Sequence, residues 1–242
     1  MNRVDIDKEY LIKLLNKGYS YNKIAKLLNI GYGTVKNLCV KYEIDTLNRC
    51  KNKERFIINK IDSKELAYLI GIILTDGYYN KNHKMCINVK LEDKEILDFI
   101  ASIIDAKVTI FNDTIKNKHI FPRARLTRRI DGLDTYIKSG CKEERNVPIL
   151  NKNLENYMLL GIFDGDGCIT WGVRKDRNRI WHKFNITSSY NIVLGVQNIL
   201  NKYNISSSIR PKKNCNCYVL EICNKKDILK IYDLLYVNNF VI

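Results

Sequence analysis

Two aspartates, Asp76 and Asp166, end two short apolar segments that repeat each other along the chain. Residues 69–77 read LIGIILTDG and residues 159–167 read LLGIFDGDG, so each copy has a glycine within it and an acid followed by glycine at its end. Carboxylate oxygens suit Mg²⁺, which takes few protein ligands and fills its shell with water and substrate phosphate. The repeat therefore predicts a divalent-metal site that the two copies share.

Each copy is predicted to be a helix that is buried on nearly all sides. The first apolar run, residues 66–74, is far shorter than the roughly 20 residues that cross a bilayer. Glycine inside a helix costs about 1 kcal/mol relative to alanine, so Gly71 and Gly161 indicate that the two helix backbones approach closely. Gly77 and Gly167 are predicted to end the helices in the left-handed conformation.

Packing through these glycines would bring the two acids together at the negative ends of the helix dipoles. A carboxylate there is disfavoured by about 0.3–1 kcal/mol, and the acids would also repel each other. Divalent cations and a phosphate between them would remove both penalties. The alternative is a pair of core helices that each end in an Asp-Gly turn, but the matched glycine and acid positions favour the metal site.

The charge of the chain indicates what it binds. Its 242 residues include 41 Lys and Arg against 26 Asp and Glu, a formal net charge of +15. Such an excess favours a polyanion bound through counterion release. A membrane surface would also attract it, but the sequence has no long apolar segment, lipidation signal or signal peptide. The predicted partner is therefore a nucleic acid, with no membrane and no small-molecule substrate.

The two motifs resemble those of the LAGLIDADG homing endonucleases in their single-chain, two-motif form. Residues 159–167 are the closer match, whereas residues 69–77 depart from the family pattern at Leu74 and Thr75 and keep the acid. The resemblance covers about residues 60–242. It implies an α+β fold of two pseudo-symmetric αββαββα halves, with the motif helices at their junction and two antiparallel sheets that grip double-stranded DNA.

The same resemblance implies an activity and its cofactor. The protein would be a monomeric, site-specific DNA endonuclease that hydrolyses one phosphodiester in each strand and serves intron mobility. Asp76 and Asp166 would be the catalytic residues and would bind Mg²⁺, or another divalent cation such as Mn²⁺, together with Thr75 and Gly165. The family also keeps a basic residue near each metal site. The candidates, before the closing helix of each half, are Arg128, Arg129, Lys225 and Lys226. We expect a cytoplasmic protein encoded by a bacterium or a phage.

After each motif the sequence predicts the same order of elements. The first half reads as a hairpin at 78–90, a helix at 94–104, a hairpin at 107–130 and a closing helix at about 131–141. The second half reads as a hairpin at 168–187, a helix at 190–203, a hairpin at 206–222 and a helix at 226–236. Apolar and polar residues alternate in the hairpins, so one face of each sheet is predicted to be cationic and the other to pack on helices.

A cationic two-stranded ribbon fits the major groove of DNA, where arginine can bind guanine and asparagine can bind adenine. The candidates for DNA contact on the hairpins are Lys84, Asn88, Lys90, Arg123, Arg125, Arg129, Arg174, Arg177, Arg179, Lys183, Asn185, Arg210 and Lys212.

Residues 1–44 are predicted to be a separate all-α module with helices at 8–17, 21–28 and 34–42, an arrangement typical of a helix-turn-helix. Its last helix would present side chains to a major groove, and a three-helix packing module without DNA contact is the alternative. The groove-facing candidates are Tyr32, Thr34, Lys36 and Asn37. Residues 45–62 read as a basic linker, followed by the first half (63–148) and the second half (149–242).

The eight cysteines lack the paired spacing of a zinc site and are predicted to be reduced thiols. Two other functions remain open. One is a DNA-binding transcriptional regulator that keeps this scaffold without catalysis, and the other is an intron RNA maturase. Regulators of this kind tend to lose the acid pair, which this chain keeps.

Overall fold

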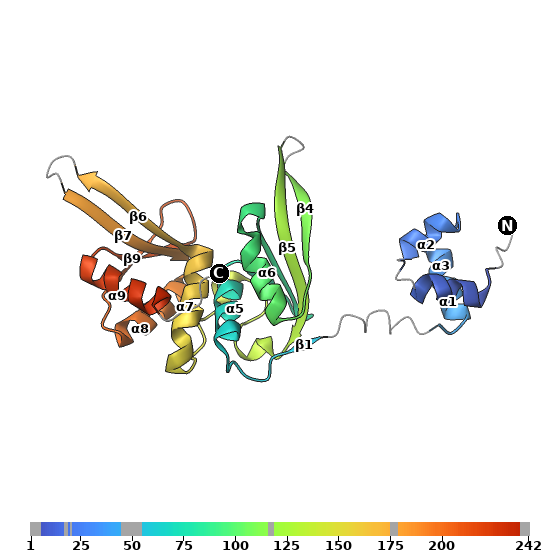
Figure 1. Cartoon of the computed structure of the whole chain (residues 1–242), viewed down its shortest axis with the longest axis horizontal. Helices are drawn as coiled ribbons and strands as arrows, with labels where there is room; N and C mark the ends of the chain where they lie inside the picture. The colour runs from blue at the N-terminus through green and yellow to red at the C-terminus, as the bar shows by residue number, and fades with distance from the viewer. Residues whose placement is uncertain are drawn as a thin grey trace. The chain divides into compact units, whose positions relative to one another are not determined.

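The computed structural model describes residues 6–16, 19, 21–44, 55–115, 119–174 and 179–237. They belong to two compact units, Met1–Glu54 and Arg55–Ile242 (Figure 1). Across the described residues, no helix is both long enough and apolar enough to cross a membrane.

The first unit is a three-helix module. Helices α1 (Lys8–Asn16), α2 (Tyr21–Leu27) and α3 (Tyr32–Lys41) enclose a small core that includes Leu11 and Val35, both fully buried. The helices agree with the predicted ones to within about two residues at each end. The four candidate side chains of the last helix, Tyr32, Thr34, Lys36 and Asn37, are all exposed on α3. Their contact with DNA stays a prediction.

The segment read as a linker divides between the two units. Residues 45–54 lie outside the described residues. Strand β1 (Phe56–Ile57) pairs in parallel with the end of β5 (His119–Asp131), and Ile58 and Ile61 are buried in the core of the second unit. Residues 55–62 are therefore part of the folded second unit, because two of their apolar side chains are needed in its core.

The second unit consists of two halves with the same order of elements. The first half contains α5 (Lys64–Thr75), β2 (Gly77–Tyr79), β3 (Lys84–Lys90), a 3₁₀ turn at Leu91–Asp93, α6 (Lys94–Ile103), β4 (Val108–Ile115) and β5. The second half contains α7 (Lys152–Asp166), β6 (Gly167–Arg174), β7 (Arg179–Ser188), α8 (Tyr190–Lys202), β8 (Ser208–Pro211), β9 (Tyr218–Ile222) and α9 (Lys225–Tyr236). The predicted α+β fold and its hairpins are confirmed.

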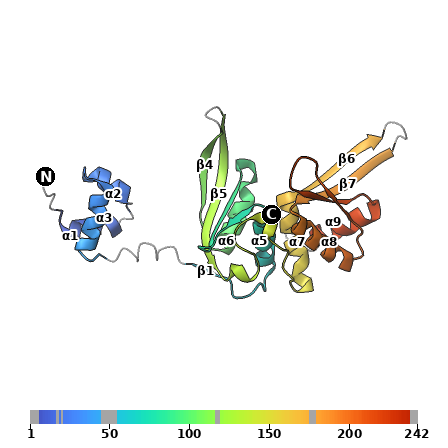
Figure 2. The same cartoon turned by 180° about the vertical axis from the view of Figure 1, so that it is seen from behind.

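The two sheets have corresponding strand orders. In the first, β2 pairs with β3, β3 with β5 and β5 with β4, all antiparallel; in the second, β6 pairs with β7, β7 with β9 and β9 with β8 in the same way. Helices α5 and α7 lie side by side at the junction, with the strands of the two halves on opposite sides of them (Figures 1 and 2). The halves are thus related by a pseudo-twofold at the two motif helices.

One predicted element differs. The closing helix expected at about 131–141 is only a 3₁₀ turn, Leu133–Thr135, whereas α9 closes the second half as predicted. The reason is local: Gly132, directly before the turn, and Gly140 have φ values of 83° and 109°, so neither can be part of a continuous helix over 131–141. The first half is therefore αββαββ followed by a turn.

The glycines within the helices confirm the predicted close packing. A Cβ added to Gly71 would lie 2.2 Å from the carbonyl oxygen of Met158, and one added to Gly161 would lie 2.3 Å from the carbonyl oxygen of Tyr68. Both obstacles are backbone atoms of the opposite motif helix, so only glycine allows the two helices to approach this closely.

The glycines after the acids have a different role from the predicted one. Neither Gly77 nor Gly167 has a positive φ; Gly167 is extended at −89°, and Asp76 itself caps α5. An added Cβ would lie 2.6 Å from Cα of Ile73 at Gly77 and 2.1 Å from the ring of Phe163 at Gly167. These positions require glycine because the chain turns directly back on its helix, and the left-handed caps were a wrong prediction.

A buried arginine fixes the end of α5. Arg145, in the segment that joins the halves, is 1% exposed. Its Nη1 donates to the carbonyl oxygens of Ile73 at 2.8 Å and Gly77 at 2.7 Å, and its Nη2 donates to that of Gly140 at 3.2 Å. A cation at a helix C-terminus satisfies carbonyls that lack helical partners and compensates the helix dipole. Arg145 thus holds the backbone on both sides of Asp76.

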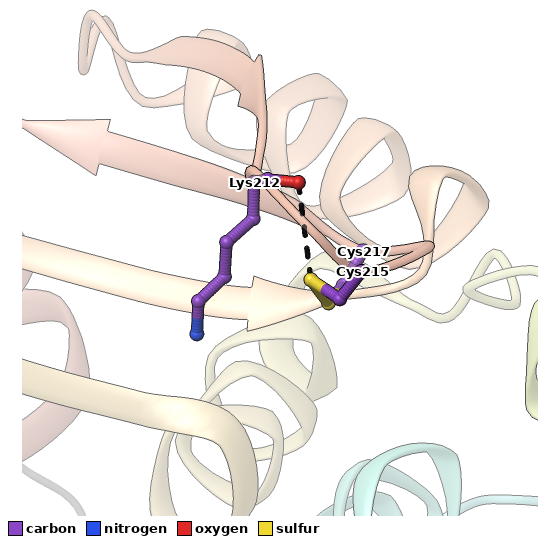
Figure 3. The surroundings of a disulfide bond; sticks show 3 residues. All are labelled: Lys212, Cys215 and Cys217. Carbon is purple, nitrogen blue, oxygen red and sulfur yellow. Dashed lines mark hydrogen bonds between the residues drawn. A yellow bond between two sulfur atoms is a disulfide. The ribbon is translucent and has the colours of Figure 1, made fainter.

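Two of the cysteines contradict the prediction of reduced thiols. Cys215 and Cys217 form a disulfide in the turn between β8 and β9, with Sγ of Cys215 3.9 Å from the carbonyl oxygen of Lys212 (Figure 3). The other cysteines in the described part of the chain are free thiols. The two sulfurs meet because the tight hairpin turn brings residues two apart onto the same side.

Candidate functional site

The two predicted acids meet at the C-terminal ends of α5 and α7. Asp166 is the last residue of α7, and Asp76 follows directly after α5. A Cβ added to Gly165 would lie 2.0 Å from Oγ1 of Thr75 and 3.2 Å from Oδ2 of Asp76. The carboxylate of Asp76 therefore lies against the last turn of the opposite helix, next to Asp166.

The electrostatics of Asp76 reflect this crowding. Desolvation and then the negative charge of Asp166 raise the pKa of Asp76 to about 6, although Lys142 opposes the shift. Asp76 is nevertheless exposed to water, so the surrounding protein desolvates its carboxylate only in part. Its neighbour is better compensated, because Nζ of Lys142 lies 2.6 Å from Oδ2 of Asp166, whose side chain is 15% exposed.

The donor set fits a divalent cation. Two hard carboxylate side chains converge, and desolvation followed by the charge of Asp166 raises the pKa of Asp76, so a cation bound between them would be favoured. No group of three or more His, Cys, Asp or Glu side chains suited to a metal occurs among the described residues. Water or substrate oxygens would have to complete the coordination shell.

The other predicted site residues are distributed differently. Oγ1 of Thr75 donates within its own helix, to the carbonyl oxygens of Gly71 and Ile72. Arg128 lies on the apolar side of its strand, 15% exposed and 4.0 Å from Asp105, because its neighbours at 127 and 129 occupy the polar face. Lys225 and Lys226 are exposed at the start of α9.

Lys142 is the basic residue that contacts a motif acid, and the sequence reading missed it. It lies in a 3₁₀ turn, Lys142–Glu144, of the segment that joins the halves. Its separation of 24 residues from Asp166 corresponds to no motif. The only available signal was the presence of basic residues in that connecting segment.

The raised pKa of Asp76 predicts how the stability of the protein depends on pH. A raised pKa means that folded Asp76 binds its proton more tightly than unfolded Asp76, so its contribution to folding falls as pH rises from about 4 through about 6. In chelator at pH 8, Asp76→Asn is expected to raise the free energy of unfolding by about 1 kcal/mol, a value reduced for the water that reaches the carboxylate.

Urea unfolding at pH 8 and pH 4 would measure this effect, and the gain should disappear at pH 4, where Asp76 is protonated in the folded protein. Asp166→Asn is the matched variant and should bring a smaller gain, because the relief of repulsion is offset by the loss of the partner of Lys142. A loss of stability for Asp76→Asn at pH 8 would contradict the assignment of charge repulsion at the site.

The sheet of the first half has the predicted polar and apolar faces. Its apolar face includes Met85, Ile87, Ala124, Leu126 and Ile130, all fully buried. Its polar face is formed by four cross-strand pairs of β3 and β5. These are Lys84 with Arg129, Cys86 with Thr127, Asn88 with Arg125, and Lys90 with Arg123.

The sheet of the second half gathers its candidates in a shallow groove. The groove is lined by residues that include Lys183, Asn185, Arg210 and Lys212, four of the predicted contacts. Residues 174 and 179 are paired in the backbone register at the ends of β6 and β7, and Arg177 lies outside the described residues. The predicted cationic face therefore exists in both halves, while contact of any one side chain with DNA stays a prediction.

An acid that the sequence reading missed lies in this groove. Glu221 accepts hydrogen bonds from Arg210 at 2.6 Å and Lys183 at 3.0 Å. The bond from Arg210 is the main reason that the pKa of Glu221 falls to about 2. Glu221 is thus anionic at neutral pH and fixes two cations of an otherwise basic surface.

The strand order, the glycine contacts and the converging acids agree with the two-half fold that the LAGLIDADG resemblance implies. Residues 153–236 match the sequence model of a family described as LAGLIDADG-like domain, so most of the second half is similar to that family.

Solved structures agree with this fold. The homing endonuclease I-WcaI bound to its DNA recognition sequence is similar with a TM-score of 0.55 and 18% identity, over 81% of this chain and 89% of that one. The N-terminal LAGLIDADG domain of DUF199/WhiA gives 0.52 and 18%, over 78% and 90%. The I-LtrWI LAGLIDADG homing endonuclease bound to target DNA gives 0.50 and 11%, over 73% and 85%. No curated protein sequence matches this chain.

Proposed function

We propose that this protein is a site-specific, metal-dependent endonuclease that hydrolyses one phosphodiester in each strand of double-stranded DNA, as homing endonucleases do. The observation that carries the proposal is the meeting of Asp76 and Asp166 at the ends of two glycine-packed helices, where desolvation and then the charge of Asp166 raise the pKa of Asp76. An acid pair without a catalytic or binding role would carry an electrostatic penalty at the centre of the fold that Lys142 offsets only in part.

The cationic sheets support a DNA substrate. The net charge of +15 fits a polyanion, and each half presents a polar face of basic side chains. Two proteins of similar fold, I-WcaI and I-LtrWI, are homing endonucleases whose structures contain their DNA sites. At 18% and 11% identity they support the fold, and the acid pair of this chain is the further reason to extend DNA cleavage to it.

In this proposal the two acids would hold Mg²⁺, with Mn²⁺ as an alternative, and Thr75 and Gly165 would lie beside the ion as further candidates for its shell. The cation would stabilise the charge that develops on the attacking and leaving oxygens of the phosphodiester. Lys142 offsets the charge of Asp166 and orients its carboxylate. The two sheets of one monomer would bind one DNA duplex. The helices of the first unit would lengthen the stretch of DNA that is contacted.

A DNA-binding regulator is the second candidate. The N-terminal LAGLIDADG domain of DUF199/WhiA has a similar fold, and the bond from Lys142 to Asp166 could serve a purely structural role in this chain. The two candidates share DNA binding and differ in whether the acids support cleavage.

The decisive experiment incubates a random-sequence duplex library with Mg²⁺ and the wild-type protein, the Asp76→Asn/Asp166→Asn double variant, or the wild type with chelator. Sequencing of new DNA ends then reads out cleavage, and sequencing of retained duplexes reads out binding. Defined ends from the wild type with Mg²⁺ alone are expected. Sequence-selective binding without new ends would favour the regulator, and equal cutting by the double variant would refute the assigned acids.

A further inference from the structure

One arginine on the polar face of the first half is held in a fixed geometry. Nε of Arg125 donates to Oδ1 of Asn88 at 2.7 Å, across the β3–β5 pair. The guanidinium also lies over the ring of Phe111, with Cζ 4.1 Å from the ring centroid. A hydrogen bond and a stacked ring together restrict both the position and the plane of the guanidinium.

The partner that holds this arginine is itself held. Sγ of Cys86 lies 3.9 Å from Oδ1 of Asn88, and Oγ1 of Thr127 lies 3.6 Å from Sγ of Cys86. These side chains come from two adjacent strands and occupy one face of the sheet. Asn88 is therefore part of a short polar row and not an isolated surface amide.

The bond from Nε leaves the end of the guanidinium for a ligand. Arginine has five N–H donors, and the two terminal nitrogens carry four of them. Within the described residues, no hydrogen bond from Nη1 or Nη2 of Arg125 to the protein occurs, and the side chain is exposed. Two parallel donors in a fixed plane match the O6 and N7 acceptors of guanine in the major groove.

The place of Arg125 in the sheet favours a base over a phosphate. Residue 125 pairs with Asn88 of β3 on one side and with Thr109 of β4 on the other, so it lies in the interior of the sheet. When a ribbon enters the major groove, its interior faces the base edges and its margins approach the phosphates. Arg129 of the same strand differs, because it pairs with Lys84 of β3 and makes no such bond or ring contact among the described residues.

We propose that Arg125, positioned by Asn88 and Phe111, reads a guanine in the target DNA through its two terminal nitrogens. The inference rests on the proposed function, since it names one base of the sequence that this protein would recognise. Asn88 and Phe111 are positioning residues in this scheme. They limit the arrangements of the guanidinium before DNA arrives, so less freedom is lost on binding.

The test is a binding selection from random duplexes with the full chain in chelator, which prevents cleavage. The variants are Arg125→Lys, Asn88→Ala and the matched control Arg129→Lys, each with thermal unfolding measured to verify folding. The two lysine variants keep the charge, so loss of the arginine fork is separated from loss of electrostatic attraction.

The wild type should enrich a motif with one guanine preferred about 5- to 150-fold over other bases at its position. Arg125→Lys should reduce that preference to about threefold or less and leave the salt dependence of binding unchanged. Asn88→Ala should reduce the preference partly. Arg129→Lys changes another predicted DNA contact, so it should alter selection only at other positions of the motif and leave the preference at this position intact.

Two results would overturn the inference alone: Arg125→Lys weakening all sequences equally, as a phosphate contact would, or Arg129→Lys causing the same loss at the same position. A wild-type protein that enriches no motif would overturn the proposed function together with the inference.

Discussion

Asp76→Asn and Asp166→Asn, made one at a time, are each expected to reduce double-strand cleavage by about 1,000-fold. Metal-assisted charge stabilisation contributes several kcal/mol to such reactions, and each 1.36 kcal/mol is a factor of ten in rate. The two acids come from different halves, so each single variant should still cut one strand if each half serves one strand. A supercoiled plasmid with the selected site would report this as nicked product accumulating without linear product.

The matched control is Asp164→Asn. Asp164 lies two residues before Asp166 on the same helix, but its carboxylate accepts a hydrogen bond from the hydroxyl of Tyr68 at 2.9 Å. It therefore belongs to the packing of the junction, and an asparagine oxygen can accept the same bond. Cleavage by this variant should stay within about threefold of the wild type, since a polar partner is kept. Equal inactivation by Asp164→Asn would mean that the loss reflects general damage to the helix end.

Gly71→Ala is expected to have the largest effect on stability. The added Cβ would lie 2.2 Å from a backbone carbonyl oxygen of α7, which cannot rotate away as a side chain could. The two motif helices would have to separate, and with them the contact between the halves. We expect a loss of about 3 kcal/mol or more in the free energy of unfolding, at the upper end of the range for overpacking, measured by urea unfolding of the full chain.

Gly33→Ala provides the comparison. Gly33 is also inside a helix, α3, but an added Cβ there meets no atom within 4 Å. Because alanine is the better helix former by about 1 kcal/mol, this variant should be neutral or slightly stabilising. If both substitutions had the same small effect, the close backbone contact between α5 and α7 would not exist in solution.

The sequence by itself determined the elements and their repetition. Apolar residues at fixed spacing predicted the hairpins and helices of both halves, because burial of one face imposes a period of two on strands and a longer one on helices. The paired glycines predicted the contact between the two motif helices. Glycine destabilises a helix locally, so its presence in both indicates a close approach of their backbones. The local signal failed where glycine was misread: Gly132 and Gly140 stop the closing helix, and Gly77 and Gly167 are needed for space.

Only the tertiary structure decided which charges meet. Lys142 reaches Asp166 across 24 residues, Lys183 reaches Glu221 across 38, and Arg145 reaches the end of α5 across 72. No periodicity connects positions so far apart, because their contact depends on how the two halves and their connecting segment pack in space. The two acids can therefore be identified from the sequence alone. The roles of Lys142 beside Asp166, of Arg145 at the end of α5 and of Arg125 on the sheet follow only from the folded structure.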